Sequence, residues 1–244
     1  MSDRAWYLNC EAGDVGDRAI LVGDRGRVGR VAGLLEDARW LNEDRGLTTV
    51  TGERDGCRIT VSAFGMGAPI ATVVLHELHQ LGVRTFLRLG TVMALAPVQM
   101  GDMVIADGAL RAESTSATYV PDGYPAVGDF ALGGALRAAA EAAGMRWHAG
   151  LVASYDGFYT QMAGALDEHD RLRALGVLAV DMETSAVLAV ARALGSRAAS
   201  LCAATVDAET SARLAIPERE AAEDAMVRIG LDALASLEPQ GVPS

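Results

Sequence analysis

Short apolar segments alternate with segments of helical character along this 244-residue chain, and this alternation most constrains how the chain folds. Ala19–Val22, Thr85–Leu89 and Val177–Val180 are apolar runs with the length of strands, and predicted helices follow the first and the last of them. No linker or internal repeat interrupts the pattern. Strands that alternate with helices favour a sheet covered by helices. We therefore predict a single α/β domain over residues 1–244, a three-layer sandwich in which helices flank a central mixed, mostly parallel sheet.

The remaining elements follow from hydrophobic periodicity and from turn residues. Strands are predicted at Thr48–Thr51, Arg58–Ala63, Met103–Ala106, Gly150–Ala153 and Ala198–Ala204. Helices are predicted at Arg30–Leu35, Pro69–Leu81, Phe130–Ala143, Asp167–Leu175, Met182–Leu194 and Pro217–Leu237. The segment Tyr119–Gly128 contains two prolines and is predicted to be a loop.

Charge and cysteine usage exclude several kinds of partner. The net charge of −11 produces an overall field that repels nucleic acid and anionic membranes. Cys10, Cys57 and Cys202 are isolated and show no zinc-binding spacing, which is typical of reduced cytosolic thiols. The first residues lack the apolar region of a signal peptide, and no segment is long and apolar enough to span a bilayer. We expect a cytoplasmic protein with no nucleic-acid or membrane partner.

Arginines beside glycine-rich turns predict a site for an oxyanion. The turn Gly23–Val28 follows the first apolar run, Phe64–Pro69 follows another, and Arg88–Thr91 lies at the end of a third. Guanidinium groups and uncommitted backbone N–H groups are what phosphate binds. Farther along, Asp181-Met182-Glu183 supplies acceptors suited to sugar hydroxyls. An anion site and a sugar site together indicate a glycosyl-transfer enzyme that uses phosphate.

Each signal alone has an ordinary structural alternative. Arg88 could belong to a buried ion pair, Glu183 could favour a helix dipole, and Phe158 could be a core aromatic. The glycines at Gly65 and Gly67 could begin a dinucleotide site, but the third glycine and the acidic residue of that fingerprint are missing. The interpretation as a phosphate-using enzyme therefore depends on the order and spacing of these motifs taken together, not on any one of them.

Taken together, these motifs resemble the nucleoside phosphorylase-I superfamily, and within it the uridine phosphorylases. Gly23–Val28 resembles the turn GDPxRV of that family, and Arg88–Thr91 resembles R-I/V-G-T. Tyr124–Phe130 resembles FPAVxDF, Ser154–Tyr159 resembles SxDxFY, and Asp181–Glu183 resembles EME. The resemblance extends over nearly the whole chain and implies phosphorolysis of a nucleoside.

The resemblance also implies the roles of individual residues. Phosphate would be bound by Gly23, Arg27, Arg45, Arg88 and Thr91, with Arg45 reaching the site of a neighbouring subunit. The ribose would be held by Tyr7, Met182 and Glu183, and the base by Met93, Phe158 and Gln161. Arg88, Thr91 and Glu183 would be the catalytic residues.

The chain departs from the family pattern at several positions. Tyr7 replaces a histidine that approaches the sugar 5′-hydroxyl, Met93 replaces a glycine beside the base, and Asp181 replaces a glutamate. The side chains that ligate a monovalent cation in some uridine phosphorylases align with Gly46 and Ile70, so we expect no metal site. No cofactor is implied, because inorganic phosphate is the co-substrate.

The identity of the base is only partly constrained. Purine phosphorylases of this superfamily protonate the base with an aspartate, and Ala208 stands at that position, with Asp207 one residue earlier. This favours a pyrimidine, although no arginine follows Gln161 where uridine phosphorylases carry one. A neutral phenol at Tyr7 tolerates either an ordinary 5′-hydroxyl or a cationic 5′-amino group on the sugar.

We therefore expect a pentosyltransferase that converts a uridine-type nucleoside, with or without a 5′ modification, to free base and ribose 1-phosphate. Family members are built from dimers, so we expect a homo-oligomer, a hexamer, with active sites shared across the dimer interface. The alternatives are a purine nucleoside phosphorylase, a nucleosidase of the same fold, and a non-catalytic nucleoside-binding protein. The arginines Arg27, Arg45 and Arg88 argue against a nucleosidase, which lacks phosphate ligands.

Overall fold

A computed structural model describes residues 4–162 and 164–238; residues 1–3, 163 and 239–244 of the predicted domain lie outside the described residues. The strands are β1 (Arg18–Val22), β2 (Glu36–Asn42), β3 (Thr49–Arg54), β4 (Cys57–Ala63), β5 (Thr85–Ala94), β6 (Met103–Ala112), β7 (Ala126–Val127), β8 (Trp147–Tyr155), β9 (Val177–Asp181) and β10 (Arg197–Asp207). The α-helices are α1 (Arg25–Ala32), α2 (Ala68–Gln80), α3 (Phe130–Ala142), α4 (Ala165–Ala174), α5 (Thr184–Ala193) and α6 (Ile216–Ala235).

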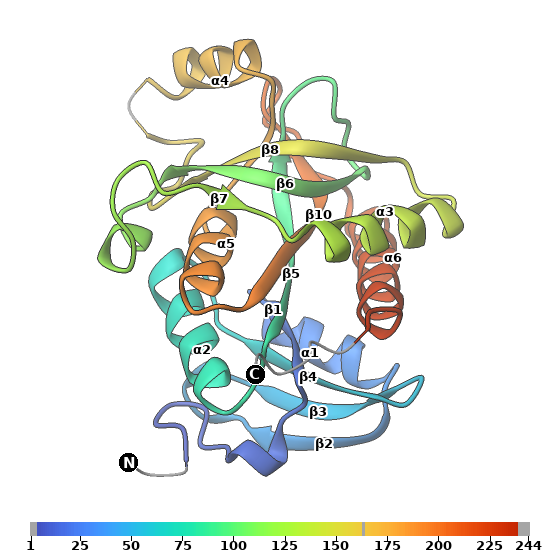
Figure 1. Cartoon of the computed structure of the whole chain (residues 1–244). Coiled ribbons are helices and arrows are strands. Elements are labelled where there is room, and N and C mark those ends of the chain that lie inside the picture. The colour runs from blue at the N-terminus through green and yellow to red at the C-terminus, as the bar shows by residue number, and fades with distance from the viewer. Residues whose placement is uncertain (1–3, 163, 239–244) are drawn as a thin grey trace.

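The strands form one mixed sheet that closes on itself at one end (Figure 1). Its order is β10-β6-β8-β9-β5-β1-β4-β3-β2, β7 pairs with β6, and β10 pairs with β5 as well as with β6. Strands β10, β6, β8, β9 and β5 therefore make a closed ring. Parallel pairing joins β4, β1, β5 and β10, whereas β2 and β3 extend the open end as antiparallel strands.

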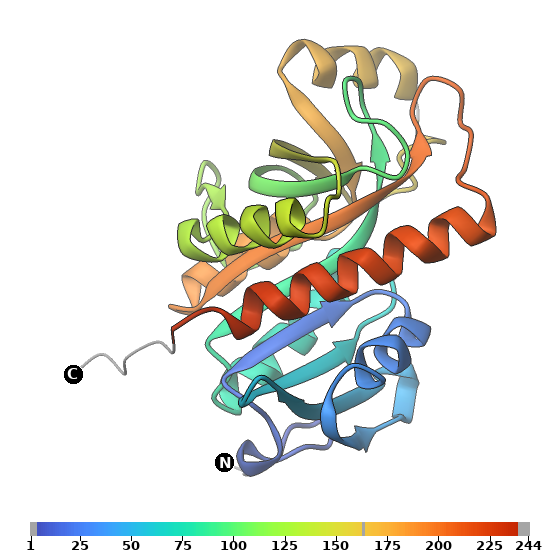
Figure 2. The same cartoon turned by 90° about the vertical axis from the view of Figure 1, so that its right-hand side faces the viewer.

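Helices cover both faces of the sheet, which gives three layers and confirms the predicted α/β sandwich. Helices α2 and α5 lie on one face, and α1, α3 and α6 lie on the other, with α6 running across the molecule (Figures 1 and 2). Because neither face of the central strands meets water, most of their residues are apolar, and Arg88 of β5 is a buried exception.

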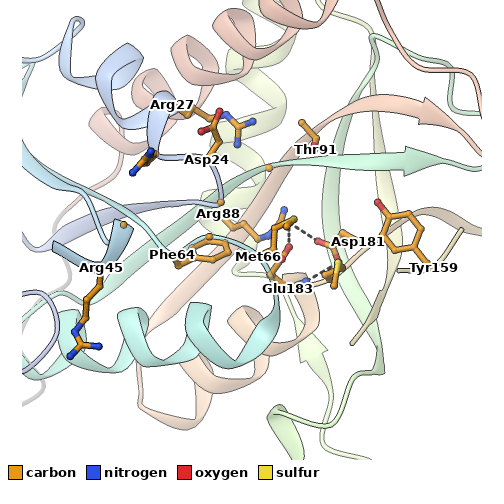
Figure 3. A pocket seen from close by; sticks show the side chains of 16 residues that line it. Asp24, Arg27, Arg45, Phe64, Met66, Arg88, Thr91, Tyr159, Asp181 and Glu183 are labelled. Carbon is orange, nitrogen blue, oxygen red and sulfur yellow. Dashed lines mark hydrogen bonds and ion pairs between the residues drawn. The ribbon is translucent and has the colours of Figure 1, made fainter. Parts of the chain in front are cut away.

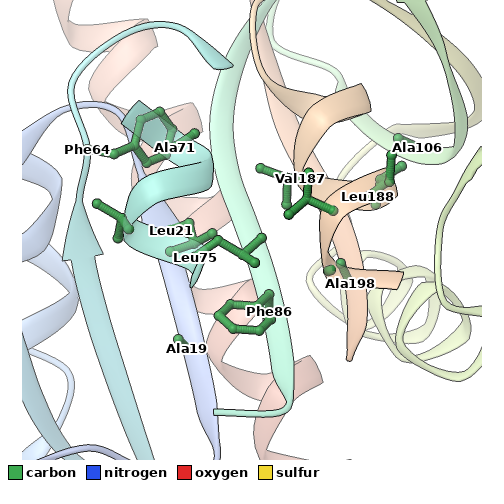
Figure 4. Close-up of a cluster of buried hydrophobic side chains, with 14 of the residues drawn as sticks. Ala19, Leu21, Phe64, Ala71, Leu75, Phe86, Ala106, Val187, Leu188 and Ala198 are labelled. Carbon is green, nitrogen blue, oxygen red and sulfur yellow. The ribbon is translucent and has the colours of Figure 1, made fainter. Parts of the chain in front are cut away.

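Successive side chains of the central strands enter opposite halves of the core, as the pleat of a strand requires. On β1, Leu21 joins the cluster beneath α2 and α5, whereas Ile20 joins the cluster beneath α1, α3 and α6. On β5, Phe86 and Leu87 divide in the same way. Figure 4 shows Leu21 and Phe86 meeting Leu75 of α2.

The structure differs from the prediction at three elements: one helix starts earlier, and two strands were not predicted. Helix α1 begins at Arg25 rather than at Arg30, because the Asp24 side chain caps its first turn by accepting from the Gly26 N–H at 2.8 Å. Strand β2 was not predicted, since it is an edge strand whose residues are mostly exposed and lack apolar alternation. Strand β7 has only two residues and lies within the segment predicted to be a loop.

Strand β5 is also longer than predicted, and this changes the position of Arg88. The strand continues past Leu89 to Ala94, pairing with β10 and β9 after β1 has ended at Val22. Arg88 therefore lies inside a strand, not at its carboxyl end. The early end of β1 leaves an open space beside this part of β5.

Within the described ranges, none of the helices combines the length and the apolar character that crossing a membrane requires.

Candidate functional site

A cavity of about 610 Å³, here called the first cavity, opens beside β5 where β1 ends (Figure 3). The segments that form it are the turns after β1 and β4, the middle of β5, and the segment between β9 and α5. It is lined by Gly23, Asp24, Arg25, Arg27, Arg45, Gly46, Phe64, Gly65, Met66, Arg88, Gly90, Thr91, Tyr159, Asp181, Met182 and Glu183. The structure therefore brings together all the predicted phosphate residues and two of the three predicted ribose residues.

Two glycine turns meet at one wall of the first cavity. The Gly65 N–H donates to the carbonyl of Gly23 at 3.0 Å. A Cβ on Gly23 would lie only 2.8 Å from the Gly65 carbonyl oxygen, so the close approach of the two backbones requires glycine at this position. The absence of side chains there leaves the backbone accessible to a small ligand.

The guanidinium of Arg88 is buried at the floor of the first cavity and faces two carboxylates. Its Nη2 lies 2.5 Å from Glu183 Oε2 and 3.1 Å from Asp181 Oδ2 (Figure 3). Burial acts to lower the pKa of Arg88, but Cys202, Asp181 and Glu183 raise the pKa above its ordinary value. Arg88 therefore remains a permanent cation in an anionic setting.

Gly90 makes room for that guanidinium. A Cβ on Gly90 would overlap the guanidinium carbon and both terminal nitrogens of Arg88. The Arg88 side chain thus folds back over its own strand toward α5. The glycine in the sequence Arg88–Thr91 is required by this packing rather than by a turn.

Arg27 is the second buried arginine of the first cavity. Its Nη1 donates to the Leu89 carbonyl at 3.1 Å, and its Nη2 lies 3.2 Å from Glu223 Oε1 of α6. The hydrogen bond holds the first turn of α1 against β5, and the ion pair joins it to α6. Nothing local in the sequence pointed to Glu223, which lies in a polar stretch of the terminal helix.

Both arginines keep one donor unused. The Nε atoms of Arg27 and Arg88 are buried and have no hydrogen-bond partner. A buried N–H group without an acceptor is costly, by about 1–3 kcal/mol. Both arginines line the first cavity, so two buried guanidinium groups with incomplete hydrogen bonding lie beside the same space.

Glu183 is fixed at the start of α5 by backbone and side-chain contacts. Its Oε1 accepts from the Gly67 N–H at 2.6 Å, and its Oε2 accepts from Arg88. A carboxylate offers about four acceptor positions, so lone pairs remain for further donors. The residue before it, Met182, contributes an apolar patch to the same wall.

Asp181 is held by hydroxyl groups as well as by Arg88. Its Oδ1 accepts from Ser154 Oγ at 2.6 Å, and its Oδ2 accepts from the Thr184 N–H at 3.1 Å. The shorter side chain of aspartate thus fits a closed network at the end of β9. The sequence pointed to Asp181 as an acceptor for sugar hydroxyls, whereas here its carboxylate contacts Ser154, Thr184 and Arg88.

A second cavity, of about 680 Å³, adjoins the first and shares Asp24, Arg27, Thr91 and Tyr159 with it. Its other lining residues are Arg30, Phe158, Thr160, Gln161, Thr205, Val206, Ser211, Arg213, Leu214, Ile216, Arg219 and Glu223. Two of the three predicted base residues, Phe158 and Gln161, therefore lie in the second cavity and not in the first.

Tyr159 stands between the two cavities and was not predicted as a site residue. Burial is the main factor that raises its pKa, to about 12, and Asp181 and Glu183 raise it further. Its hydroxyl therefore stays protonated at neutral pH and can donate a hydrogen bond. Its ring centroid lies 6.1 Å from that of Phe158, which is 56% exposed.

Met93 does not line either cavity. The residue is 1% exposed and packs in a core cluster with Ala153 and Val180. Met93 lies two residues after Thr91 and on the same face of β5, but there the neighbouring strands β8 and β9 cover the side chain. The methionine therefore fills space behind the site and offers no surface to a base in this structure.

Tyr7 also lies outside both cavities, at the surface near Arg45. The guanidinium carbon of Arg45 is 5.5 Å from the centre of the Tyr7 ring, and the ring is 40% exposed. The Arg45 side chain points away from Arg27 and Arg88 (Figure 3). Tyr7 and Arg45 thus form a pair apart from the buried arginines.

Comparison with known proteins gives matches over most of the chain. The sequence model of the Phosphorylase superfamily matches residues 17–235. A guanosine phosphorylase of Halorubrum lacusprofundi is 40% identical over 82% of this chain and 82% of its own length. A uridine phosphorylase of Thermococcus kodakarensis is 35% identical over 89% of this chain and 82% of its own length, and one of Escherichia coli is 33% identical over 78% and 79%.

Proposed function

Because this chain belongs to the phosphorylase superfamily, we propose that it catalyses the reversible phosphorolysis of a nucleoside to free base and pentose 1-phosphate. It is a pentosyltransferase that takes inorganic phosphate as co-substrate and needs no bound cofactor. The observation that carries the proposal is a pair of buried arginines, Arg27 and Arg88, which have unpartnered Nε donors and line a cavity together with the Glu183 carboxylate.

Phosphate binds among Gly23, Arg27, Arg88 and Thr91 in this proposal, with Arg45 supplied by a neighbouring subunit. The guanidinium groups of the two buried arginines donate to phosphate oxygens, while Arg88 Nη2 keeps its contact with Asp181 at 3.1 Å. Charge-assisted contacts of this kind are strong in a site that excludes water.

The ribose lies against Met182 and Glu183. Glu183 is anchored through Gly67 and Arg88, so its remaining lone pairs accept from the 2′- and 3′-hydroxyls of the sugar. Phosphate sits beneath the ring, where it stabilises the positive charge that develops at C1′ as the C1′–N bond lengthens. A phosphate oxygen then forms the new bond to C1′, and the electron pair of the broken bond leaves with the base. Catalysis rests on positioning and electrostatics, without a side-chain nucleophile.

The base occupies the second cavity, against Phe158, Tyr159 and Gln161. A uridine-type substrate fits best, because Ala208 stands where a purine phosphorylase would carry the aspartate that protonates the base. Ala208 is buried in the core, and the Asp207 carboxylate accepts from the Thr210 N–H at 2.8 Å. The Thr210 hydrogen bonds lower the pKa of Asp207, which keeps that group ionised.

A 6-oxopurine nucleoside is the second candidate substrate, favoured by one comparison. The relative from Halorubrum lacusprofundi, which is 40% identical, is named a guanosine phosphorylase. A leaving guanine needs more stabilisation than uracil does, so its turnover would depend on donors in the second cavity. The 5′ side of the sugar, hydroxyl or amino, faces Tyr7 of a neighbouring subunit.

The active unit is a homo-oligomer built from dimers, a hexamer, in which each site borrows Tyr7 and Arg45 from its neighbour. Exposed apolar groups support this arrangement, since Trp6 is 85% exposed and Met66 at the mouth of the first cavity is 84% exposed. The three cysteines are free, in line with a cytoplasmic location.

Release of free base in the presence and absence of phosphate tests the proposal. Uridine, cytidine, guanosine, inosine and adenosine are incubated with the protein, and base and pentose 1-phosphate are quantified by chromatography. We expect phosphate-dependent release from uridine or guanosine, with one pentose 1-phosphate formed for each base. Release that is independent of phosphate would identify a nucleosidase instead, and binding without release would identify a nucleoside-binding protein.

A further inference from the structure

The second cavity contains an arginine that lies far from every motif in the sequence. Arg213 lines this cavity together with Thr91, Phe158 and Gln161. It belongs to the segment between β10 and α6, which the sequence did not connect with the site. Uridine phosphorylases carry a base-reading arginine shortly after the residue matched by Gln161, and this chain has none there.

A backbone hairpin fixes the position of Arg213. Arg213 forms an antiparallel bridge with Val206, which lines the same cavity. The Asp207 N–H donates to the Ala212 carbonyl at 2.9 Å, and the Leu214 N–H donates to the Thr205 carbonyl at 3.0 Å. The residue is thus presented at the end of β10 by a closed turn rather than by a free loop.

Within the described part of the chain, Arg213 differs from the other arginines of the second cavity in its lack of an acidic partner. Arg27 and Arg219 both lie near Glu223, at 3.2 and 3.9 Å, and Arg30 lies 2.9 Å from Asp224. Among residues 4–162 and 164–238, no carboxylate lies within ion-pair distance of Arg213. An exposed guanidinium without an internal partner is available to a ligand.

We propose that Arg213 is a specificity-determining residue that binds a ring carbonyl of the base. This inference rests on the proposed function, and it defines the substrate class more closely. A guanidinium only donates, so it accepts a carbonyl oxygen as partner and rejects an exocyclic amino group. Uracil and 6-oxopurines present a carbonyl where cytosine and adenine present an amino group. Arg213 therefore selects oxo bases over amino bases, in pyrimidines and purines alike.

The same contact assists departure of the base. As the C1′–N bond breaks, negative charge spreads over the ring and its carbonyl oxygens. A permanent cation beside a carbonyl stabilises this charge more in the transition state than in the bound nucleoside. For a 6-oxopurine, the two-pronged guanidinium also reaches O6 and N7 together, the pairing that arginine makes with guanine.

The test compares kcat/KM at saturating phosphate for two matched pairs, uridine with cytidine and guanosine with adenosine. The variants are Arg213→Ala, Arg213→Lys and the control Arg228→Ala, which removes an exposed arginine of α6 that lines neither cavity. Arg213→Ala is expected to lower kcat/KM for the oxo nucleoside by about ten- to a hundredfold, as loss of a charged hydrogen bond implies. It should leave the amino nucleoside unchanged, and Arg213→Lys should recover part of the loss.

Product inhibition provides a second readout where an amino nucleoside turns over too slowly to measure. Inhibition by uracil or guanine should weaken in Arg213→Ala by a similar factor and remain unchanged in Arg228→Ala. Equal losses for oxo and amino nucleosides, or wild-type selectivity in Arg213→Ala, would overturn the assignment while leaving phosphorolysis intact. A wild-type protein that shows no phosphate-dependent cleavage of any nucleoside would overturn the proposed function and this inference with it.

Discussion

The groups around Arg88 satisfy only part of its guanidinium. Asp181 and Glu183 hold one terminal nitrogen, and Nε remains without an acceptor. The arginine was predicted from its place in a motif, but the carboxylates that orient it were not, since they lie more than ninety positions away in the chain. Contacts over such separations depend on the pairing of strands, which local patterns do not encode.

Replacing Arg88 tests its part in the reaction. Arg88→Ala is expected to lower kcat/KM for phosphorolysis on the order of a hundredfold or more, because one charged donor to phosphate is lost. Arg88→Lys keeps the positive charge but lacks the planar, two-pronged guanidinium, so kcat/KM should fall less than in Arg88→Ala. Steady-state kinetics with varied phosphate and circular dichroism of both variants provide the check. Wild-type phosphorolysis by a folded Arg88→Ala would contradict the assignment.

Gly90 allows a test of the position of Arg88 that removes none of the proposed catalytic side chains. In Gly90→Ala the new methyl group occupies the space of the Arg88 guanidinium, so the arginine must move. We expect kcat/KM to fall by about tenfold or more and the free energy of unfolding to fall by about 1–3 kcal/mol, as for other overpacked sites. Gly29→Ala in α1 is the control, because nothing lies within 4 Å of a Cβ at that position. Equal activity of the two variants would show that Arg88 does not depend on this space.

Among the elements of the fold, the strands that are buried on both faces of the sheet were predicted best from the sequence. The runs that became β1, β4, β5 and β9 were recognised because both halves of the core require apolar side chains. Strand β2 was missed because its side chains are exposed at the edge of the sheet, and only its backbone pairing with β3 defines it. The full length of β5 was missed because its last residues pair with strands far along the chain.

Helix α2 ends in a group that links stability to pH. His79 Nδ1 lies 2.9 Å from Ser196 Oγ. Burial lowers the pKa of His79, and electrostatic interactions with Arg84 and His76 lower it further. The unfolded chain therefore binds a proton more readily than the folded chain. The stabilising contribution is complete above the ordinary histidine value of about 6.5 and is lost as pH falls from there toward the lowered pKa.

Thermal unfolding between pH 7.5 and 5 measures this effect. The melting temperature of the wild type is expected to fall more steeply below about pH 6.5 than that of His79→Gln, whose side chain has no charge to acquire. A parallel pH dependence of the two proteins would show that His79 does not contribute. Both curves should still share the common loss that comes from protonation of carboxylates at lower pH.

At the scale of the whole molecule, the proposed sharing of sites makes a distinct prediction. Arg45→Ala and Glu183→Ala should each be nearly inactive. Mixed oligomers, formed by denaturing and refolding the two variants together, should regain part of the activity, because some sites then combine an intact Arg45 with an intact Glu183. Refolding each variant alone is the control. A fully active monomer, measured by light scattering at assay concentration, would contradict the shared site.

The closed ring of β10, β6, β8, β9 and β5 has a consequence for synthesis of the protein on the ribosome. Arg197 of β10 pairs with Thr85 of β5, so the ring cannot close until all but the last part of the chain has been translated. A nascent chain that ends before β10 already contains Arg88, yet it lacks the strand that shields one side of β5. Limited proteolysis of stalled nascent chains should find β5 accessible until β10 has emerged from the exit tunnel. The wall of the first cavity that β5 forms is therefore completed in one late step of translation, not gradually.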